Sequence, residues 1–134
     1  GKVLQVVTNT HATRFTTSST SFVAATGYTI AITPSATSSK IFVTASSMVD
    51  TQASGRVGYA TLYRDSTNLG DAEGIGAIYS DSGRAYAPIT MSVLDSPSTT
   101  SAITYQVYWR TNGGAVVFND TEGEAQLTAF EIAG

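Results

Sequence analysis

Hydrophobic and polar residues alternate with a period of two along most of the chain, which is the pattern of half-buried β-strands. In residues 28–33, for example, Tyr28, Ile30 and Ile32 share one face of an extended segment. Almost no segment has hydrophobic residues at helical spacing. We expect strands at residues 2–8, 28–33, 40–49, 56–64, 87–95, 102–110, 114–120 and 125–133.

Residues that favour turns separate these segments, chiefly glycine, proline, asparagine, aspartate and serine. Asn112-Gly113-Gly114 is the strongest hairpin signal, because these residues accept positive φ. About eight short strands with such turns predict an all-β fold, an antiparallel two-sheet β-sandwich of jelly-roll type. The expected core residues are Ile30, Ile32, Ile41, Val43, Ile89, Met91, Val93, Ile103, Val107 and Trp109.

One phrase occurs twice, as "TPSATSSKIFVTA" at residues 33–45 and as "SPSTTSAITYQVY" at residues 96–108. In both, Pro34 or Pro97 ends a strand because proline has no N–H for the β-ladder. A Ser/Thr loop then leads into the next strand. We interpret each phrase as a connector between strands, used once in each half of the fold. Reuse of one connector and duplication of a half-domain would both give this pattern.

Composition fits a single domain, residues 1–134, with a formal net charge of −3 and 13% charged residues. Scattered Lys and Arg residues argue against a nucleic-acid-binding surface. The absence of cysteine excludes disulfides and thiolate metal sites. No apolar run approaches the ~18 residues of a membrane span, so we expect no membrane insertion. The chain begins at Gly1 without a signal-peptide pattern, and we interpret it as a fragment or a processed product.

The sequence gives weak signals for catalysis or metal binding. His11 lies in a polar stretch that we expect to be a loop, and a surface or interface role is favoured over that of a catalytic base. Asp71 and Glu73, and Asp120 and Glu122, are carboxylates at i and i+2 that could contribute to a calcium site. Solvated charge on loops and strand edges is the favoured explanation for them. We therefore expect no catalytic residue, no metal and no cofactor.

Aromatic residues are the richest candidates for binding, although aromatic residues in β-domains most often pack in the core or against a neighbouring strand. Trp109 shares a face with Val107 and is expected in the core, whereas Tyr108 is expected to be exposed. The turn-rich segments 50–56 and 65–88 are the expected recognition loops. The predicted receptor-contact residues are Tyr79, Arg84, Tyr86, Tyr63 and Arg56.

Five segments carry a resemblance: "GKVLQVV", "TSSTSFVAATGYTIAITPSATSSKIFV", "LYRDSTNLG", "LDSPSTTSAITYQVYWRT" and "LTAFEIAG". Together they resemble small β-domains found at the C-terminal ends of phage tail-fibre and related virion proteins, many of them from marine phages. The resemblance covers nearly the whole chain and is weakest at residues 71–88. It implies the tip of a longer virion fibre, an extracellular location, a homotrimer and a jelly-roll-like sandwich. It implies no catalytic residues.

Three functions are compatible with these observations. The first is a non-catalytic tail-fibre tip that binds a host cell-surface receptor, either a glycan or a protein. The alternative is a structural virion module, such as a capsid decoration or a head-fibre domain, without a receptor site. An enzyme, such as a depolymerase fragment or an esterase, is the least supported, because no catalytic motif accompanies His11.

Overall fold

The computed structural model describes residues 1–120 and 123–134, and every regular element in them is a β-strand. The strands are β1 (Val3–His11), β2 (Phe15–Thr17), β3 (Val23–Ile32), β4 (Lys40–Asp50), β5 (Arg56–Arg64), β6 (Thr67–Asn68), β7 (Gly76–Ser80), β8 (Tyr86–Asp95), β9 (Ile103–Thr111), β10 (Val116–Phe118) and β11 (Ala125–Ile132). Within this described part, no helix is long and apolar enough to cross a membrane.

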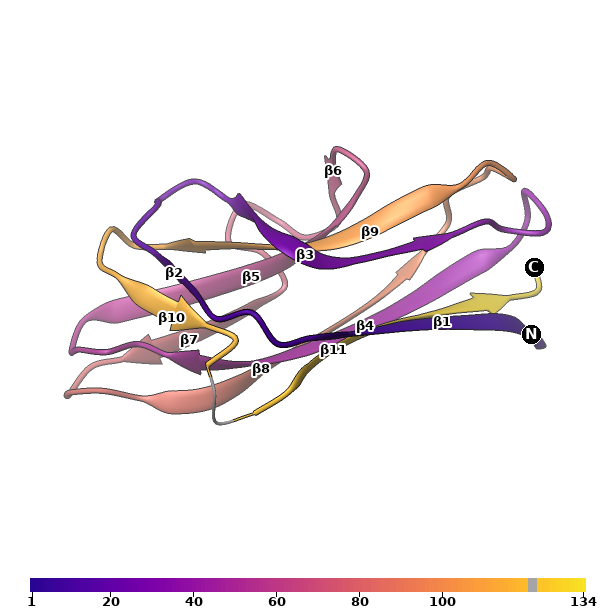
Figure 1. Ribbon diagram of the computed structural model, residues 1–134. Coiled ribbons are helices and arrows are strands. Elements are labelled where there is room, and N and C mark those ends of the chain that lie inside the picture. The colour runs from indigo at the N-terminus through magenta and orange to yellow at the C-terminus, as the bar shows by residue number, and fades with distance from the viewer. Residues whose placement is uncertain (121–122) are drawn as a thin grey trace.

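Two antiparallel sheets pack face to face (Figure 1). The long strands of sheet A lie in the order β1-β11-β4-β8, and the short strands β10 and β2 extend the sheet where β11 ends. Sheet B has the order β3-β9-β5-β7, and β6 also pairs with β5. Every connection between long strands except that from β5 to β7 crosses between the sheets, which is the arrangement of a jelly roll. The predicted all-β, two-sheet fold is confirmed.

All eight predicted strands are present, but the interval from 65 to 88 is not the continuous recognition loop that we expected. It contains β6, β7 and the first residues of β8, and Tyr79 and Tyr86 lie on these last two strands. In β7, Gly76 and Ala77 add little hydrophobic contrast, so the alternation is weak and the sequence pattern missed this strand. β3 also starts earlier than expected, at Val23.

The repeated phrase marks equivalent positions in the two halves of the fold. Residues 33–39 join β3 to β4, and residues 96–102 join β8 to β9, so both segments are connectors, as predicted. Both carry the chain from one sheet to the other at the end of the sandwich where the two termini lie (Figure 1).

The hairpin predicted at Asn112-Gly113-Gly114 is wrong. This turn connects β9 in sheet B to β10 in sheet A, so the strands that it joins do not pair with each other. Gly113 does have the positive φ that the sequence suggested, at 110°. Turn chemistry reports the local backbone conformation, whereas the choice of strand partner depends on the whole sheet.

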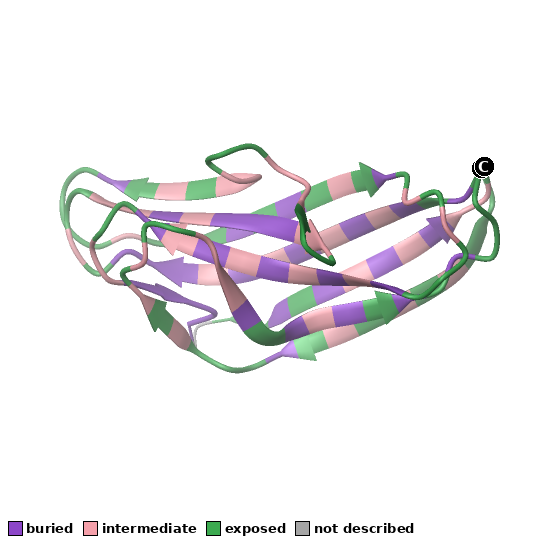
Figure 2. Ribbon diagram, turned by 90° about the horizontal axis from the view of Figure 1, so that it is seen from above, coloured by how far each residue is buried: buried purple, intermediate pink, exposed green. Residues whose placement is uncertain are grey.

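Side chains from the inner faces of both sheets form one core, and burial alternates along the strands (Figure 2). All the predicted core residues are buried except Val93, which is half-buried and packs against the core. Trp109 is fully buried, with its ring centroid 5.8 Å from that of Tyr28 and 4.5 Å from that of Phe118. The period-two pattern therefore identified the inner faces of the sheets correctly.

Candidate functional site

The loops 51–55, 81–85 and 112–115 gather at the end of the sandwich opposite to both termini, and we call this region the loop end (Figure 1). Hydrogen bonds tie these loops to one another. The Gly55 amide donates to the Ser80 carbonyl at 2.6 Å, and the Thr51 amide donates to the Ala85 carbonyl at 3.0 Å. The Asn112 side chain donates to the Gly55 carbonyl at 2.8 Å. The loop end is thus connected by hydrogen bonds between its loops.

Arg84 and Tyr86 form a cluster with Asp50 at the loop end. The Arg84 Nε donates to Asp50 Oδ1 at 2.8 Å, and Nη2 donates to Asp50 Oδ2 at 2.6 Å. Arg84 also lies over the Tyr86 ring, 4.6 Å from its centroid, and its Nη2 donates to the Tyr86 hydroxyl at 2.9 Å. The bidentate side of the guanidinium, which we expected to meet a receptor, therefore faces a carboxylate of the same chain.

Asp50 is fully buried and its carboxylate is fully engaged. Its other hydrogen bonds come from the backbone amide of Gln52 at 2.9 Å and from the Gln52 side chain at 3.3 Å. Burial alone would raise the pKa of Asp50, but the hydrogen bonds from Arg84 and Gln52 outweigh it and hold the pKa below its usual value. Asp50 consequently stays ionised and keeps Arg84 in place at neutral pH.

Three of the predicted receptor-contact residues are exposed: Tyr79 and Tyr86, with 62% and 40% of their surface accessible, and Arg84, whose side chain is 53% exposed in spite of its bonds to Asp50. Tyr79 pairs with Val57 in sheet B, and Tyr86 pairs with Asp50 in sheet A. The two rings flank the 81–85 loop from different sheets. They do not form one flat aromatic platform.

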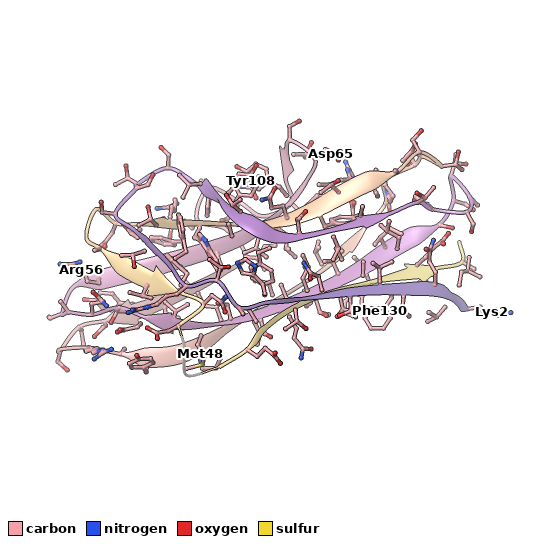
Figure 3. The ribbon with its side chains drawn as sticks, in the orientation of Figure 1. Lys2, Met48, Arg56, Asp65, Tyr108 and Phe130 are labelled. Carbon is pink, nitrogen blue, oxygen red and sulfur yellow. The ribbon has the colours of Figure 1, made fainter. Side chains whose placement is uncertain are left out.

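The structure does not bring Tyr63 and Arg56 into the same cluster. Tyr63 lies on the outer face of sheet B and stacks on Tyr108, with ring centroids 3.8 Å apart. Tyr108, expected to be exposed, is therefore half-buried by this contact. Arg56 lies at the loop end, where its Nη1 donates to the Ala115 carbonyl at 2.7 Å (Figure 3).

Sequence reasoning missed Arg110, which holds the 65–75 segment on the outer face of sheet B. Its guanidinium carbon lies 3.8 Å from the centroid of the Tyr59 ring and 5.3 Å from that of the Phe22 ring. Its Nη2 donates to the Ala72 carbonyl at 3.1 Å and is 4.0 Å from a Glu73 carboxylate oxygen. Tyr59 and Arg110 are cross-strand partners, and only knowledge of the strand register could have revealed the pair.

The acidic residues considered as calcium ligands lie in separate parts of the fold. Asp71 accepts a hydrogen bond from the backbone amide of Glu73 at 2.8 Å, within the segment over sheet B. Asp120 follows β10 in sheet A and is buried, 3.6 Å from Arg14. Glu122 lies outside the described residues. Among the residues that the structure describes, no group of three or more His, Asp or Glu side chains could hold a metal ion.

His11 is not the loop residue that we expected. It is the last residue of β1, is buried, and stacks on Tyr28 with ring centroids 5.0 Å apart. Burial lowers the pKa of His11, because desolvation disfavours its charged form. In the described part of the chain, its ring makes no hydrogen bond to a serine or a carboxylate. The arrangement is that of a packed core residue.

A search of protein-family models finds no match to this chain, and neither does a search of curated proteins. Solved structures of infectious bursal disease virus match it at low identity. Those of the Gt and Gx strains are 15% and 16% identical, with TM-scores of 0.42 and 0.41, and each match covers 97% of this chain and 38% of the other. A mutant VP2 protein of that virus, in derived T=1 particles, is 16% identical, with a TM-score of 0.39, 97% of this chain covered and 36% of the other.

This chain therefore spans less than half the length of the structures that it matches. At these TM-scores the likeness is distant and carries no conclusion about function. The jelly-roll arrangement is established by the strand pairing of the chain itself.

Proposed function

We propose that this chain is a non-catalytic jelly-roll module of a virion and that its main role there is structural. Its segments resemble β-domains of phage tail-fibre and related virion proteins. Jelly rolls are used by viral capsid proteins and also by lectins and other families. Because one fold serves many functions, the choice between a structural and a receptor-binding role has to come from the side chains.

The observation that carries the proposal is that the charged side chains expected to contact a receptor are already bound within the chain. Arg84 is held by Asp50 through two hydrogen bonds, and Arg56 is held by the Ala115 carbonyl. Moving the Arg84 donors from Asp50 to a ligand would leave this buried carboxylate without its counter-charge, which is unfavourable. A loop end that is closed on itself suits a structural module better than an open receptor site.

The structural role can be tested by locating the domain in assembled particles. We would raise an antibody against residues 1–134 and label virus particles that contain the full-length protein for electron microscopy. A structural module should be labelled at regular positions on the particle, and particles without the protein should assemble poorly or lose stability. Particles that form normally, stay stable and still infect without it would refute the structural role.

A receptor-binding role is the second candidate, favoured by the exposure of Tyr79 and Tyr86 at the end remote from the termini. Exposed tyrosines supply contact area at a low cost in conformational entropy. The ligand would be a host cell-surface glycan or protein that reaches the two rings on either side of the 81–85 loop.

Binding to host cells separates this candidate from the structural one. The double variant Tyr79→Ala, Tyr86→Ala removes both exposed rings and the contact of Tyr86 with Arg84, but keeps both residues of the Arg84–Asp50 pair. If the rings form the receptor site, adsorption of the isolated domain should weaken about 10-fold, equivalent to about 1.4 kcal/mol. Thr100→Ala, at an exposed position near the opposite end, is the control. Equal adsorption by the parent and the double variant, or none by the parent, would exclude this site.

A further inference from the structure

The outer face of sheet A carries three rows of side chains that cross its four long strands. The register places Val6, Phe130, Phe42 and Leu94 in the first row, Thr8, Thr128, Thr44 and Ser92 in the second, and Thr10, Gln126, Ser46 and Thr90 in the third. We call these twelve residues the neutral face, because none of them is charged. All are exposed or half-buried.

The first row is a continuous apolar band across the sheet. Val6 and Leu94, on the two edge strands, are each 54% exposed. Between them, the rings of Phe42 and Phe130 contact each other, with centroids 6.2 Å apart. Exposed apolar groups that line up across a sheet, rather than standing singly, mark a surface that another molecule covers.

The second and third rows consist of hydroxyl and amide side chains with short stems. The hydroxyls of Thr8 and Thr128 lie 3.0 Å apart, so neighbouring members of a row can hydrogen-bond. The short side chains leave a shallow depression of about 310 Å³ beside the apolar band. It is lined mainly by Thr44, Ser46, Thr90, Ser92, Gln126 and Thr128.

We propose that the neutral face packs against a second copy of this chain. Its rows are complementary to themselves: apolar groups pack on apolar groups, and hydroxyls both donate and accept hydrogen bonds. If the copies are arranged around a symmetry axis parallel to the strands, each row of one copy lies at the same height along that axis as the same row of its neighbour. The apolar band of one copy would then bury the apolar band of the next.

Charge favours a copy of the chain over a charged partner. Every charged residue lies off the neutral face, in a chain with a net charge of −3. Two copies can therefore meet there without burying an unpaired charge, which would be costly. A nucleic acid or an anionic membrane surface would find no lysine or arginine among the twelve residues.

The size of the face limits the contact that it can make. With strands ~4.8 Å apart and rows ~6.7 Å apart, the three rows span about 400 Å² of flat area. The uncharged surface is bounded at one end by Lys40, which is exposed and pairs with Ile132 in the next row. The flat area is about half of the ~800 Å² of accessible surface that a standard interface buries on each partner, which places the contact at the small end of specific interfaces.

The first test is the mass of the chain in solution. Sedimentation at micromolar concentration should give a multiple of 14.0 kDa, and three copies is the number that the resemblance to virion fibre domains implies. The double variant Thr44→Lys, Thr128→Lys places two charges in the centre of the neutral face and should weaken association at least ~100-fold. The control, Thr104→Lys, lies on the outer face of sheet B and should associate like the parent.

A second test reports on the face directly and does not depend on how the lysines affect folding. Because the chain has no cysteine, a single Thr128→Cys can be labelled with a maleimide without competition. Labelling should slow as the protein concentration rises and the face becomes buried, whereas Thr104→Cys should label at a constant rate. Three results would each overturn the proposal: a monomeric parent at ~100 µM, an oligomer that persists in the lysine variant, or equal labelling rates for the two cysteine variants. A parent that is still monomeric at ~100 µM would associate with a free energy weaker than about 5 kcal/mol.

Discussion

The outer faces of the two sheets differ in how far the chain itself covers them. On sheet B, the chain covers its own strands: the 65–75 segment lies over them, Arg110 is clamped between aromatic rings, and Thr61 is fully buried with its hydroxyl bonded to Asn68 at 2.6 Å. On sheet A, the neutral face has no such cover and carries no charge. This difference in cover and charge is why we propose sheet A, and not sheet B, as the side that a second copy covers.

A fully buried carboxylate lies on the inner side of sheet A. Glu131 on β11 is fully buried and accepts hydrogen bonds from the Ser35 amide at 2.7 Å, the Ser35 hydroxyl at 2.6 Å and the Gln5 side chain at 2.6 Å. These bonds, led by that from the Ser35 hydroxyl, lower the pKa of Glu131 to about 2. The carboxylate thereby fixes the 33–39 connector to sheet A.

The largest effect is expected in the core that both faces share. Trp109→Ala should lower the free energy of unfolding by about 3–5 kcal/mol, because it leaves a large cavity between the sheets. Trp109→Phe is the control and should cost much less, since the indole N–H has no hydrogen-bond partner among the described residues. Urea denaturation followed by circular dichroism measures both. Two separate transitions in the alanine variant would show that the two sheets do not unfold together.

The next largest loss of stability is expected when the 65–75 segment is released from the outer face of sheet B. Arg110→Ala should lower the free energy of unfolding by about 2 kcal/mol, because it removes a mostly buried guanidinium from the Tyr59 and Phe22 rings. Amide hydrogen exchange should speed up in residues 69–75 and remain unchanged on sheet A. Arg110→Lys keeps the charge without the flat guanidinium and should fall between the parent and the alanine variant. Unchanged exchange at residues 69–75 would mean that Arg110 does not hold the segment.

Glu131 tests the inner side of sheet A. Because its pKa lies below its usual value in the folded chain, the carboxylate stabilises the fold above about pH 4.5. This stabilisation should be lost as the pH falls from about 4.5 to about 2. Glu131→Gln should cost about 1–2 kcal/mol at neutral pH through its weakened hydrogen bonds. The stability of the Glu131→Gln variant should also vary less than that of the parent across this acidic range, and thermal melts at several pH values measure both. If the stability of the two proteins changes with pH in the same way, Glu131 is not the group responsible.

The smallest effect belongs to the neutral face of the isolated chain. Leu94→Ser should change the free energy of unfolding by less than about 0.5 kcal/mol when measured at concentrations low enough to keep the chain monomeric, because half of the leucine is already in water. The same substitution should reduce stability more at high concentration, where association buries the face. A large loss in the dilute monomer would show that Leu94 packs within the chain.

The sequence alone identified eight of the eleven strands in the described residues, missing the short β2, β6 and β7, and it also identified the inner faces and the two repeated connectors. Alternation is a local property, so Ile30, Ile41 and Trp109 could be assigned to a buried face without knowing which strands pair. His11 was misjudged because its neighbours are polar, while its burial comes from Tyr28, which reaches it only in the folded chain. The hairpin predicted at Asn112 was wrong for a similar reason, because the residues of a turn do not determine which sheet the next strand joins.

The tertiary structure decided which side chains meet, and with them the candidate sites. In the sequence Arg84 looked like a cation free to bind a ligand, but Asp50, 34 positions away, accepts hydrogen bonds from its Nε and Nη2 atoms. The row of Val6, Phe130, Phe42 and Leu94 joins residues from four strands, and only the register aligns them. Period-two patterning fixes which side of a strand faces water, because successive side chains alternate by geometry. The partner of each exposed side chain depends on strand order and register, which are settled by packing over the whole molecule.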